Sequence, residues 1–265
     1  MDLAWYIYPL AILAGIVAGI INTLAGSGSA VTLPMMDLMG LPAPVANATN
    51  RIGVLLQNIV GLGTYRSSGN LKRSDMDGGW WLVGMSMLGA VAGTWVATTL
   101  GKRQMELAIG GVMVIILITI FVNPKKWLRE SSEITEGRPD LLTLLMFVGI
   151  GFYGGFVQAG VGVFLLTALV LGVGYSMKQA NIVKLVIVLA FTVVALAVFF
   201  FSPVQINWGV GFLLAIGQMI GAWTGATFAV NVPDANVWVR RLLIVVVVYS
   251  IFRYLGLLDL IIGLF

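Results

Sequence analysis

The chain has 265 residues, of which 10% are charged and 59% are hydrophobic, and its mean hydropathy is +1.00. A soluble domain carries roughly 25% charged residues, so this composition excludes an ordinary water-soluble globule and a disordered chain. The sequence has no Cys and no His, which removes disulfides, thiol chemistry, imidazole bases and the usual zinc ligands. We therefore expect a protein embedded in the lipid bilayer, with no metal site and no cofactor.

Long stretches without a charged residue predict the membrane helices, because a spanning helix needs about 20 consecutive apolar residues. Glycine-rich segments at 25–29 and 159–162 and a turn-like segment at 202–207 divide these stretches. The sequence predicts ten helical pieces, over 4–25, 29–40, 44–66, 78–100, 104–122, 140–159, 162–174, 177–201, 207–230 and 236–257. Whether the short pieces 29–40 and 162–174 cross the bilayer or turn back inside it stays open.

The two halves of the chain resemble each other, which predicts a duplicated unit. One constant shift aligns the glycines and asparagines of the first half with those of the second: Gly15 with Gly149, Ala25-Gly26 with Ala159-Gly160, Gly28 with Gly162, and Asn47 with Asn181. A slightly smaller shift aligns Gly89, Gly93 and Trp95 with Gly217, Gly221 and Trp223. Because each half holds an odd number of pieces, the second half must enter the membrane from the opposite side. We therefore predict an all-α polytopic membrane protein of two inverted repeats, each with a glycine-broken or re-entrant helix pair and three spanning helices.

The predicted division of the chain is 1–123 for the first transmembrane repeat, 124–139 for a linker and 140–265 for the second repeat. With the N-terminus outside, the inner loops would carry Arg66, Lys72, Arg73, Lys125, Lys126, Arg129, Arg138, Lys178, Arg240 and Arg241, against Lys102, Arg103 and Arg253 outside. Lys and Arg favour the cytoplasmic side of a membrane, so this orientation and a cytoplasmic linker are expected. The same bias accounts for the net charge of +4, and no nucleic-acid partner is expected.

The two glycine-rich breaks predict a binding site, because broken helices in corresponding positions of an inverted repeat mark the midplane site of a transporter. A helix that restarts after a break points free N–H groups and the positive end of its dipole into the break, which favours an anion. The candidate substrate-binding residues of the breaks are Gly26, Ser27, Gly28 and Ser29 in the first and Gly160 and Gly162 in the second. The alternative is that these glycines only allow helices to pack closely.

Three ionisable residues are candidates for charges within the membrane, where a charge is costly and is a functional candidate by default. Arg51 and Lys184 lie at similar depths in the two halves, which favours anion binding over the alternative that each side chain snorkels to the interface. Asp37 could pair with Arg51 or carry a coupling proton, although an interfacial carboxylate is the simpler interpretation. The remaining candidates for substrate binding are polar residues near these cations: Asn47, Asn50, Gln57, Gln158 and Asn181.

The duplicated order of these motifs resembles the TauE/SafE family of membrane permeases, the sulfite exporters. The resemblance rests on Ala25-Gly26-Ser27-Gly28 with Pro34 and Ala46-Asn47-Ala48-Thr49-Asn50, and on Ala159-Gly160-Val161-Gly162 with Ala180-Asn181-Ile182-Val183-Lys184. It implies an integral protein of the bacterial inner membrane that moves sulfite or a small organosulfonate outward, using the proton gradient. In this chain Val183-Lys184 replaces a Thr-Ser pair of the pattern, and the added positive charge favours a more highly charged anion, such as a carboxylated sulfonate.

We therefore predict a secondary transporter that exports a small anion by alternating access, with one repeat rocking against the other around the midplane site. An anion channel and a membrane protein that only binds or assembles remain alternatives, and a homo-oligomer is left open. An intramembrane enzyme is not expected, since a Ser-His protease needs a His and Asp37 stands without a second in-membrane Asp. A Ser-Lys pairing of Ser27 or Ser29 with Lys184 is the one enzymatic arrangement that stays formally open.

Overall fold

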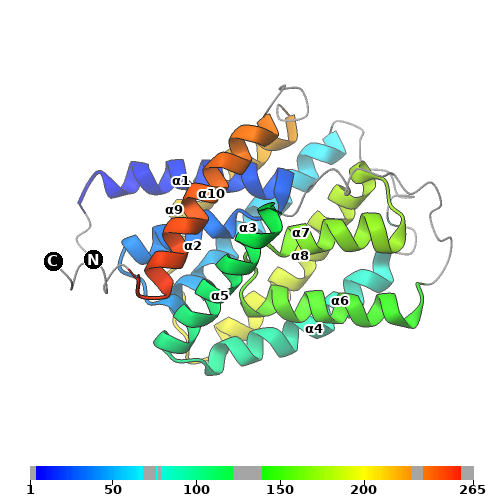
Figure 1. Ribbon diagram of the computed structural model, residues 1–265, viewed down its shortest axis with the longest axis horizontal. Helices are drawn as coiled ribbons and strands as arrows, with labels where there is room; N and C mark the ends of the chain where they lie inside the picture. The colour runs from blue at the N-terminus through cyan, green and yellow to red at the C-terminus, as the bar shows by residue number, and fades with distance from the viewer. Residues whose placement is uncertain (1–3, 68–75, 77–78, 122–138, 228–234, 258–265) are drawn as a thin grey trace.

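The computed structural model describes residues 4–67, 76, 79–121, 139–227 and 235–257, and in these residues every regular element is helical (Figure 1). The elements are α1 (Ile7–Ala25), α2 (Ser29–Leu38), α3 (Ala43–Ser67), α4 (Gly79–Thr99), α5 (Lys102–Phe121), α6 (Leu141–Phe156), α7 (Val161–Thr167) with its π-helical continuation η3 (Ala168–Val173), α8 (Met177–Phe200), α9 (Trp208–Thr227) and α10 (Ala235–Tyr254). The predicted all-α membrane architecture is confirmed. Of the predicted linker 124–139, all but the last residue lies outside the described residues.

Four of the described helices are long and apolar enough to cross a membrane, judged by length and composition: Ile7–Leu24, Gly79–Thr99, Met177–Phe200 and Trp208–Thr227. Large apolar side chains cover much of the outer surface, among them Leu88, Leu142, Val245 and Phe201. A water-soluble protein rarely exposes so much contiguous apolar surface, whereas a bilayer solvates it. The chain is therefore a multi-pass membrane protein.

Short polar motifs set the start of two helices in the second half. Asp140 caps α6 by accepting the Thr143 N–H at 3.2 Å, and hydrogen bonding from Thr143 lowers the pKa of this carboxyl group. Ser176 and Gln179 form a capping box at the start of α8, in which each side chain satisfies a free backbone N–H of the other. These caps satisfy N–H groups that would otherwise have no partner at the helix starts.

The two short pieces turn back inside the bundle instead of crossing it. α1 ends at Gly26, whose φ of 69° reverses the chain, and the Gly28 N–H at the start of α2 donates to Asn22 Oδ1 at 3.4 Å. The α6–α7 connection reverses at Gln158 and Gly160, with φ of 66° and 73°. Figure 1 shows that α1 begins and α2 ends at the left-hand end, while α6 begins and η3 ends at the right-hand end. The two re-entrant hairpins therefore enter the bundle from opposite ends.

Glycines bring two pairs of helices into backbone contact, α1 with α9 and α4 with α6. A Cβ added to any of these glycines would lie between 1.9 and 2.6 Å from a carbonyl oxygen of the facing helix: Gly15, Gly19, Gly217 and Gly221 in the first pair and Gly89, Gly93, Gly151 and Gly155 in the second. Small residues at four-residue spacing are the usual means of close helix packing in membranes. For these eight positions, close packing accounts for the glycine.

The helix contacts occur in matching pairs across the two halves. α3 packs on α9 as α4 packs on α8, α2 packs on α3 as α7 packs on α8, and α3 packs directly on α8. This is the pattern that two repeats related by a two-fold axis would give, although the inverted repeat itself stays a prediction. Gly15 faces Leu214 O and Gly151 faces Ser86 O, so the helix contacts make Gly15 equivalent to Gly151. The predicted equivalence of Gly15 and Gly149 is wrong for the packing, because Gly149 faces open space.

Two hydrophobic clusters form the interior, and neither follows a sequence half. One cluster is formed mainly by α1, α2, the start of α3, α5, α9 and α10, with Ala97 of α4 and Phe199 of α8. The other is formed mainly by α4, α6, α7, η3 and α8, with Val54 of α3. Each cluster therefore contains helices from both predicted repeats. Because α1 with α9 and α4 with α6 are also the glycine-mediated interfaces, the two halves of the chain interlock.

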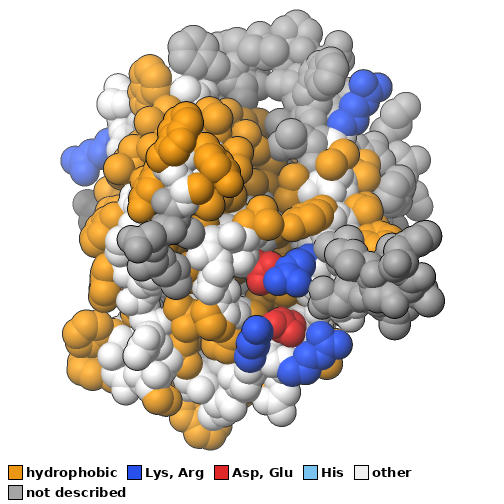
Figure 2. All heavy atoms as spheres, turned by 90° about the vertical axis from the view of Figure 1, so that its left-hand side faces the viewer, with side chains coloured by type: hydrophobic (Ala, Val, Ile, Leu, Met, Phe, Trp, Pro, Cys, Tyr) orange, Lys and Arg blue, Asp and Glu red, His pale blue; other side chains and the backbone are white. Residues whose placement is uncertain are grey.

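The end of the molecule where α2 and α10 finish carries a small group of charged side chains. Asp37 pairs with Arg253 (Oδ2 to Nε, 2.6 Å), and Glu106 pairs with Lys102 and Arg103. Figure 2 looks onto this end and shows basic and acidic side chains together near its middle, with apolar side chains around them. The three cations predicted for the outer side thus lie at one end of the bundle, while the orientation in a membrane stays a prediction.

Candidate functional site

Arg51 lies in the third turn of α3, and its side chain is completely buried. Its Nη1 donates to Gly154 O at 2.6 Å and to Gln158 Oε1 at 2.9 Å, and its Nη2 donates to Gly155 O at 2.8 Å and to Asn47 Oδ1 at 3.2 Å. The two glycine carbonyls belong to the last turn of α6, where a helix has no partners for its C=O groups. Arg51 therefore caps the C-terminal end of the broken helix α6, where the helix dipole is negative.

The residues around Arg51 extend this arrangement. Asn47 Nδ2 donates to Phe156 O at 2.7 Å, and Thr94 of α4 donates to Gly155 O at 3.1 Å. Gln158 Nε2 donates to Thr192 Oγ1 of α8 at 2.8 Å. The Phe199 ring lies 5.7 Å from the Arg51 guanidinium carbon, within the range of a cation–π contact. The end of α6 is thus held by side chains from α3, α4 and α8.

Lys184 of α8 makes the corresponding contacts with the other broken helix. Its Nζ donates to Thr23 O at 3.1 Å, to Asn22 O at 3.4 Å and to Asn181 Oδ1 at 2.9 Å, and the residue is 1% exposed. Asn22 and Thr23 lie in the last turn of α1, so Lys184 caps α1 as Arg51 caps α6. Neither cation extends to the surface, which rules out the snorkelling alternative for this conformation.

Neither buried cation has a carboxylate partner among the described residues, whose ion pairs join Lys102 and Arg103 to Glu106 and Arg253 to Asp37. Buried charges in proteins are normally paired, because removing an ion from water is costly. Helix-end carbonyls and side-chain amides compensate part of that cost, but they carry no full negative charge. The site therefore holds two basic side chains within a low-dielectric interior, without a counter-charge among the described residues.

The two glycine breaks meet at the centre of the bundle. The Gly162 N–H donates to Gly26 O at 3.1 Å, and a Cβ added to Gly26 would lie 2.2 Å from Gly162 Cα. Only glycine at both positions allows this backbone-to-backbone crossing. Gly160 has a different role, since its φ of 73° makes the turn before α7, and Gly28 packs against Ala18 O of α1. The predicted break residues are thus brought together at Gly26 and Gly162.

A chain of buried hydrogen bonds fixes the start of α2 to α3. Thr32 Oγ1 donates to Asn50 Oδ1 at 2.6 Å, and Asn50 Nδ2 donates to Ser29 Oγ at 2.9 Å. All three side chains are buried. Asn50 therefore acts as the link between the first break and the helix that carries Arg51.

Several fully buried polar atoms near this region have no hydrogen-bond partner: Ser27 Oγ, Arg51 Nε, Gln57 Oε1, Asn58 Oδ1 and Gln218 Nε2. An unpaired buried polar atom costs about 1–3 kcal/mol, so such atoms are uncommon and indicate where a ligand can bond. Ser27, Arg51 and Gln57 were predicted as site residues. Their unpartnered atoms are free to bond a substrate in this conformation.

Asp37 does not reach the two cations. It pairs with Arg253 at the end of the bundle, so the alternative that it pairs with Arg51 is wrong. The reason is the re-entrant path of α2, which carries Asp37 back toward the end where α1 begins. Asp37 therefore lies where an interfacial carboxylate would, and a role in proton coupling stays a prediction.

Sequence reasoning did not identify several residues that the structure brings to the site: Asn22, Thr23, Thr32, Thr94 and Gln218. Gln218 offered a signal, since it is an amide in the middle of a long apolar stretch. Asn22 and Thr23 act at Lys184 through their backbone carbonyls, and a backbone contact leaves no mark on residue type. Thr32 and Thr94 are ordinary helix residues whose partners come from distant parts of the chain.

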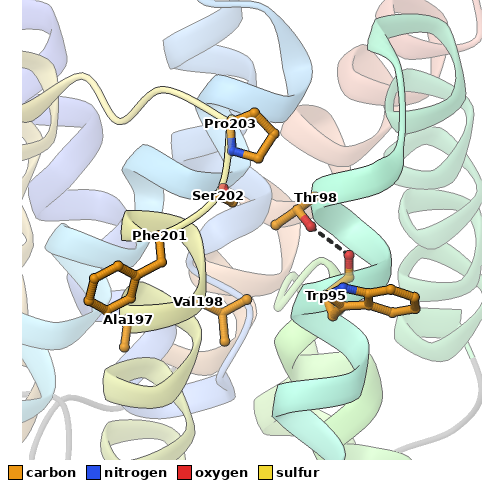
Figure 3. A pocket seen from close by; sticks show the side chains of 7 residues that line it. All are labelled: Trp95, Thr98, Ala197, Val198, Phe201, Ser202 and Pro203. Carbon is orange, nitrogen blue, oxygen red and sulfur yellow. Dashed lines mark hydrogen bonds between the residues drawn. The ribbon is translucent and has the colours of Figure 1, made fainter.

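A surface groove lies away from the cations, where α4 and α8 end (Figure 3). It is lined by Trp95, Thr98, Ala197, Val198, Phe201, Ser202 and Pro203. None of these residues is charged, and the Thr98 hydroxyl is already bonded to Trp95 O at 2.7 Å. This groove offers apolar contact at the edge of the bundle and no counter-charge for an anion.

Comparison with known proteins places the chain among membrane transporters. A model of the family described as "Sulfite exporter TauE/SafE" matches residues 11–254. The chain is 27% identical to the probable membrane transporter protein ORF9 of Sinorhizobium sp, over 96% of this chain and 95% of that protein. It is 26% identical to a probable membrane transporter protein of Haemophilus influenzae, over 85% and 86% of the two chains.

A third relative, the probable membrane transporter protein YfcA of Escherichia coli K12, is 22% identical over 81% of this chain and 77% of that protein. All three relatives are named as transporters and none as an enzyme. No solved structure matches the chain significantly.

Proposed function

This chain belongs to the sulfite exporter TauE/SafE family of membrane transporters, and from that premise we propose that it is a secondary transporter for a small anion, sulfite or an organosulfonate. The observation that carries the proposal is the pair of buried cations, Arg51 and Lys184, without a carboxylate partner among the described residues. A transported anion would supply the missing negative charge. Two cations favour a doubly charged anion, such as a sulfo-carboxylate, over a singly charged one.

Unused hydrogen-bond donors at the two breaks support anion binding. The Ser27 hydroxyl of the first break and the Nε–H of Arg51, which contacts Gln158 beside the second break, are buried without a partner, and α2 begins directly after Gly28. The positive end of the α2 dipole adds to the charge of the cations. We assign substrate contact to Ser27, Ser29, Arg51 and Lys184, with Asn47, Asn50, Gln158 and Asn181 positioning the cations and the first break.

Burial of the site favours a carrier over a channel. Ser27, Asn47, Asn50, Arg51 and Lys184 are all at most 1% exposed, and Gly26 and Gly162 close the centre. Transport by alternating access would break the Gly26–Gly162 crossing and open the site to one side at a time. Because the two sequence halves interlock through α1 with α9 and α4 with α6, we assign the motion to two mixed groups, α1–α3–α9 and α4–α6–α8, moving against each other.

The same proposal includes the direction of transport, its driving force and the membrane in which the protein lies. Export across the bacterial inner membrane, coupling to the proton gradient and an outside N-terminus follow from the family resemblance and the distribution of Lys and Arg. Asp37 is the proposed proton carrier among the carboxylates of the described residues, because it is the one within a re-entrant helix. The partners are a small anionic substrate and the lipid bilayer.

The test is counterflow of labelled sulfite and a panel of sulfonates in proteoliposomes, with and without a proton gradient. Wild type is expected to show saturable flux, which Arg51→Ala and Lys184→Met abolish. Lys102→Met is the matched control, since the Lys102 side chain is 70% exposed and lies outside the site. Flux that survives both buried-cation variants would contradict the assigned site, and absence of flux for every anion would contradict transport of this substrate class.

A further inference from the structure

Gln218 lies at a crossing of three helices in the first hydrophobic cluster. α9, which carries it, packs on both α1 and α3. The backbone of Gln218 touches Gly19 of α1, one turn before Thr23, whose carbonyl accepts a hydrogen bond from Lys184. Its side-chain amide lies against Gly53 of α3, two positions after Arg51 in the chain. The amide is therefore placed between the helix that Lys184 caps and the helix that carries Arg51.

Glycine at position 53 makes room for this amide. A Cβ at Gly53 would lie 1.9 Å from Gln218 Nε2 and 2.7 Å from Gln218 Cδ. The amide is 2% exposed, and its Nε2 has no hydrogen-bond partner. A polar group buried among helices without a partner is costly, so packing alone does not explain why an amide occupies this position.

A second buried amide with an unpartnered atom lies on the same face of α3 as Gly53. Gln57 follows Gly53 by one helical turn on the same face of α3, and helical side chains lean toward the N-terminus of their helix. Gln57 is 3% exposed, and its Oε1 has no partner. The contact between α3 and α9 thus contains two unused groups. Gln218 of α9 offers a donor, and Gln57 of α3 offers an acceptor.

We propose that Gln57 and Gln218 form a neutral subsite that binds a hydroxyl group beside the charged head of the transported anion. A hydroxyl accepts one hydrogen bond and donates another, which satisfies the free N–H of Gln218 and the free C=O of Gln57. This inference rests on the proposed anion transport and adds the substrate class, an anion with an O–H group next to its sulfonate or sulfite head.

The first half of the chain has no amide at the position that matches Gln218. Ala90 of α4 packs on Gly155 in the way that Gln218 packs on Gly19, with the facing carbonyl oxygen 2.3 Å from an added Cβ in both cases. The site is therefore asymmetric: cations cap both broken helices, whereas the neutral subsite occurs once. An anion with one hydroxyl fits this arrangement.

Binding of hydroxyethanesulfonate and ethanesulfonate to the purified full-length protein, measured by calorimetry, tests the subsite, because these anions differ only by the hydroxyl. Wild type should bind the hydroxyl compound about tenfold more tightly or better. In Gln218→Leu the ratio of the two dissociation constants should fall toward one. Gly53→Ala, which keeps the amide but displaces it, should have the same effect.

Thr224→Val is the matched control on α9, because the Thr224 hydroxyl bonds only to Ile220 O and Gly221 O of its own helix, and it should keep the wild-type ratio. Sulfite binding to Gln218→Leu distinguishes two sources of the hydroxyl. Weaker binding than in wild type would mean that the subsite also accepts the O–H of protonated sulfite. Unchanged binding would mean that it accepts only a hydroxyl carried on carbon. Equal binding of the two sulfonates by wild type, or a preference that persists in Gln218→Leu, would overturn the subsite. If the subsite is overturned but wild type still shows counterflow of sulfite, the proposed anion transport remains supported. If wild type shows no counterflow either, both the subsite and the proposed transport are contradicted.

Discussion

The surroundings of Arg51 and Lys184 differ in how many groups each cation joins, although both cations cap a broken helix. Arg51 uses all four terminal N–H groups on two carbonyls and two amide oxygens, and its Nε–H is left without a partner. Lys184 has three N–H groups and uses all of them on two carbonyls and one amide oxygen. A planar guanidinium can hold a helix end and still present a donor, whereas an ammonium cannot.

The two cations therefore differ in whether they can cap a helix and bind an anion at the same time. At Lys184, an anion can gain a hydrogen bond only if a bond to α1 is released. At Arg51, an anion can be bound through Nε while the end of α6 stays capped. We therefore expect the two cations to differ in their effect on stability and to share their effect on anion transport.

The largest effect is expected for Arg51→Ala. The change leaves Gly154 O, Asn47 Oδ1 and Gln158 Oε1 without this donor and Gly155 O with Thr94 alone, and removing one member of a buried charged network costs roughly 3–5 kcal/mol. Transport should be lost, and the thermal midpoint in detergent should fall steeply. Arg51→Lys keeps the charge but cannot reach both carbonyls, so it should recover part of the stability. A midpoint for Arg51→Ala equal to wild type would contradict the capping role.

Lys184→Met should destabilise the protein less than Arg51→Ala. The change removes three hydrogen bonds from a charged donor and leaves a side chain of similar length, so the expected loss is about 2–3 kcal/mol. Anion transport should nevertheless be lost as completely as in Arg51→Ala. The measurement pairs thermal unfolding with counterflow, and a variant with normal stability and normal flux would remove Lys184 from the site.

Gly162→Ala tests the crossing of the two glycine breaks at Gly26 and Gly162. The added Cβ would lie 2.3 Å from Gly26 Cα, and backbone cannot move aside cheaply, so we expect about 1–3 kcal/mol of destabilisation together with loss of transport. Gly149→Ala in α6 is the control, because nothing lies within 4 Å of a Cβ there. Equal flux in the two variants would show that the crossing does not matter for the transport cycle.

Asn50→Ala should have a smaller effect on stability. It removes the bonds to Thr32 and Ser29 that fix the start of α2, for which about 1 kcal/mol is typical per hydrogen bond. Since the charges are untouched, the apparent affinity for the anion should weaken without abolishing flux. Concentration dependence of counterflow measures this, and an unchanged half-saturation concentration would mean that Asn50 only supports the fold.

The smallest effect on stability is expected for Asp37→Asn. The Arg253 side chain of this pair is 39% exposed and that of Asp37 is 15% exposed, and such pairs contribute about 0–1 kcal/mol. Counterflow without a proton gradient should be retained, because Asp37 is far from the cations along the re-entrant helix. If Asp37 carries the coupling proton, acceleration by a proton gradient should be lost, and retained acceleration would exclude that role.

Much of the fold could be predicted from the sequence because a bilayer leaves few alternatives for an apolar chain. The ten predicted pieces correspond to the observed helices, since charge-free stretches and glycine breaks mark their ends. Arg51 and Lys184 could also be identified from the sequence, because a charged residue within an apolar stretch stands out. The match of Gly15 to Gly149 was wrong, since many small residues give nearly equal alignments and only facing carbonyls decide between them.

The partners of the site residues could not be predicted from the sequence. Arg51 and Lys184 bind backbone carbonyls of helices more than a hundred residues away in the chain, and a carbonyl has no residue-type signature. Pairing with Arg51 was one alternative for Asp37, but the reversal of α2 carries Asp37 to Arg253. The interlocking of the two halves likewise depends on which glycine faces meet, a property of the packed structure.

Binding of a doubly charged and a singly charged sulfonate decides whether the two buried cations receive the substrate. Calorimetry would compare sulfoacetate with ethanesulfonate on wild type, Lys184→Met and the exposed-cation control Lys102→Met. Wild type and Lys102→Met should bind sulfoacetate the more tightly, and Lys184→Met should lose that preference because one counter-charge is gone. The same preference in Lys184→Met as in wild type would show that the anion is bound elsewhere and that the buried cations only cap the broken helices.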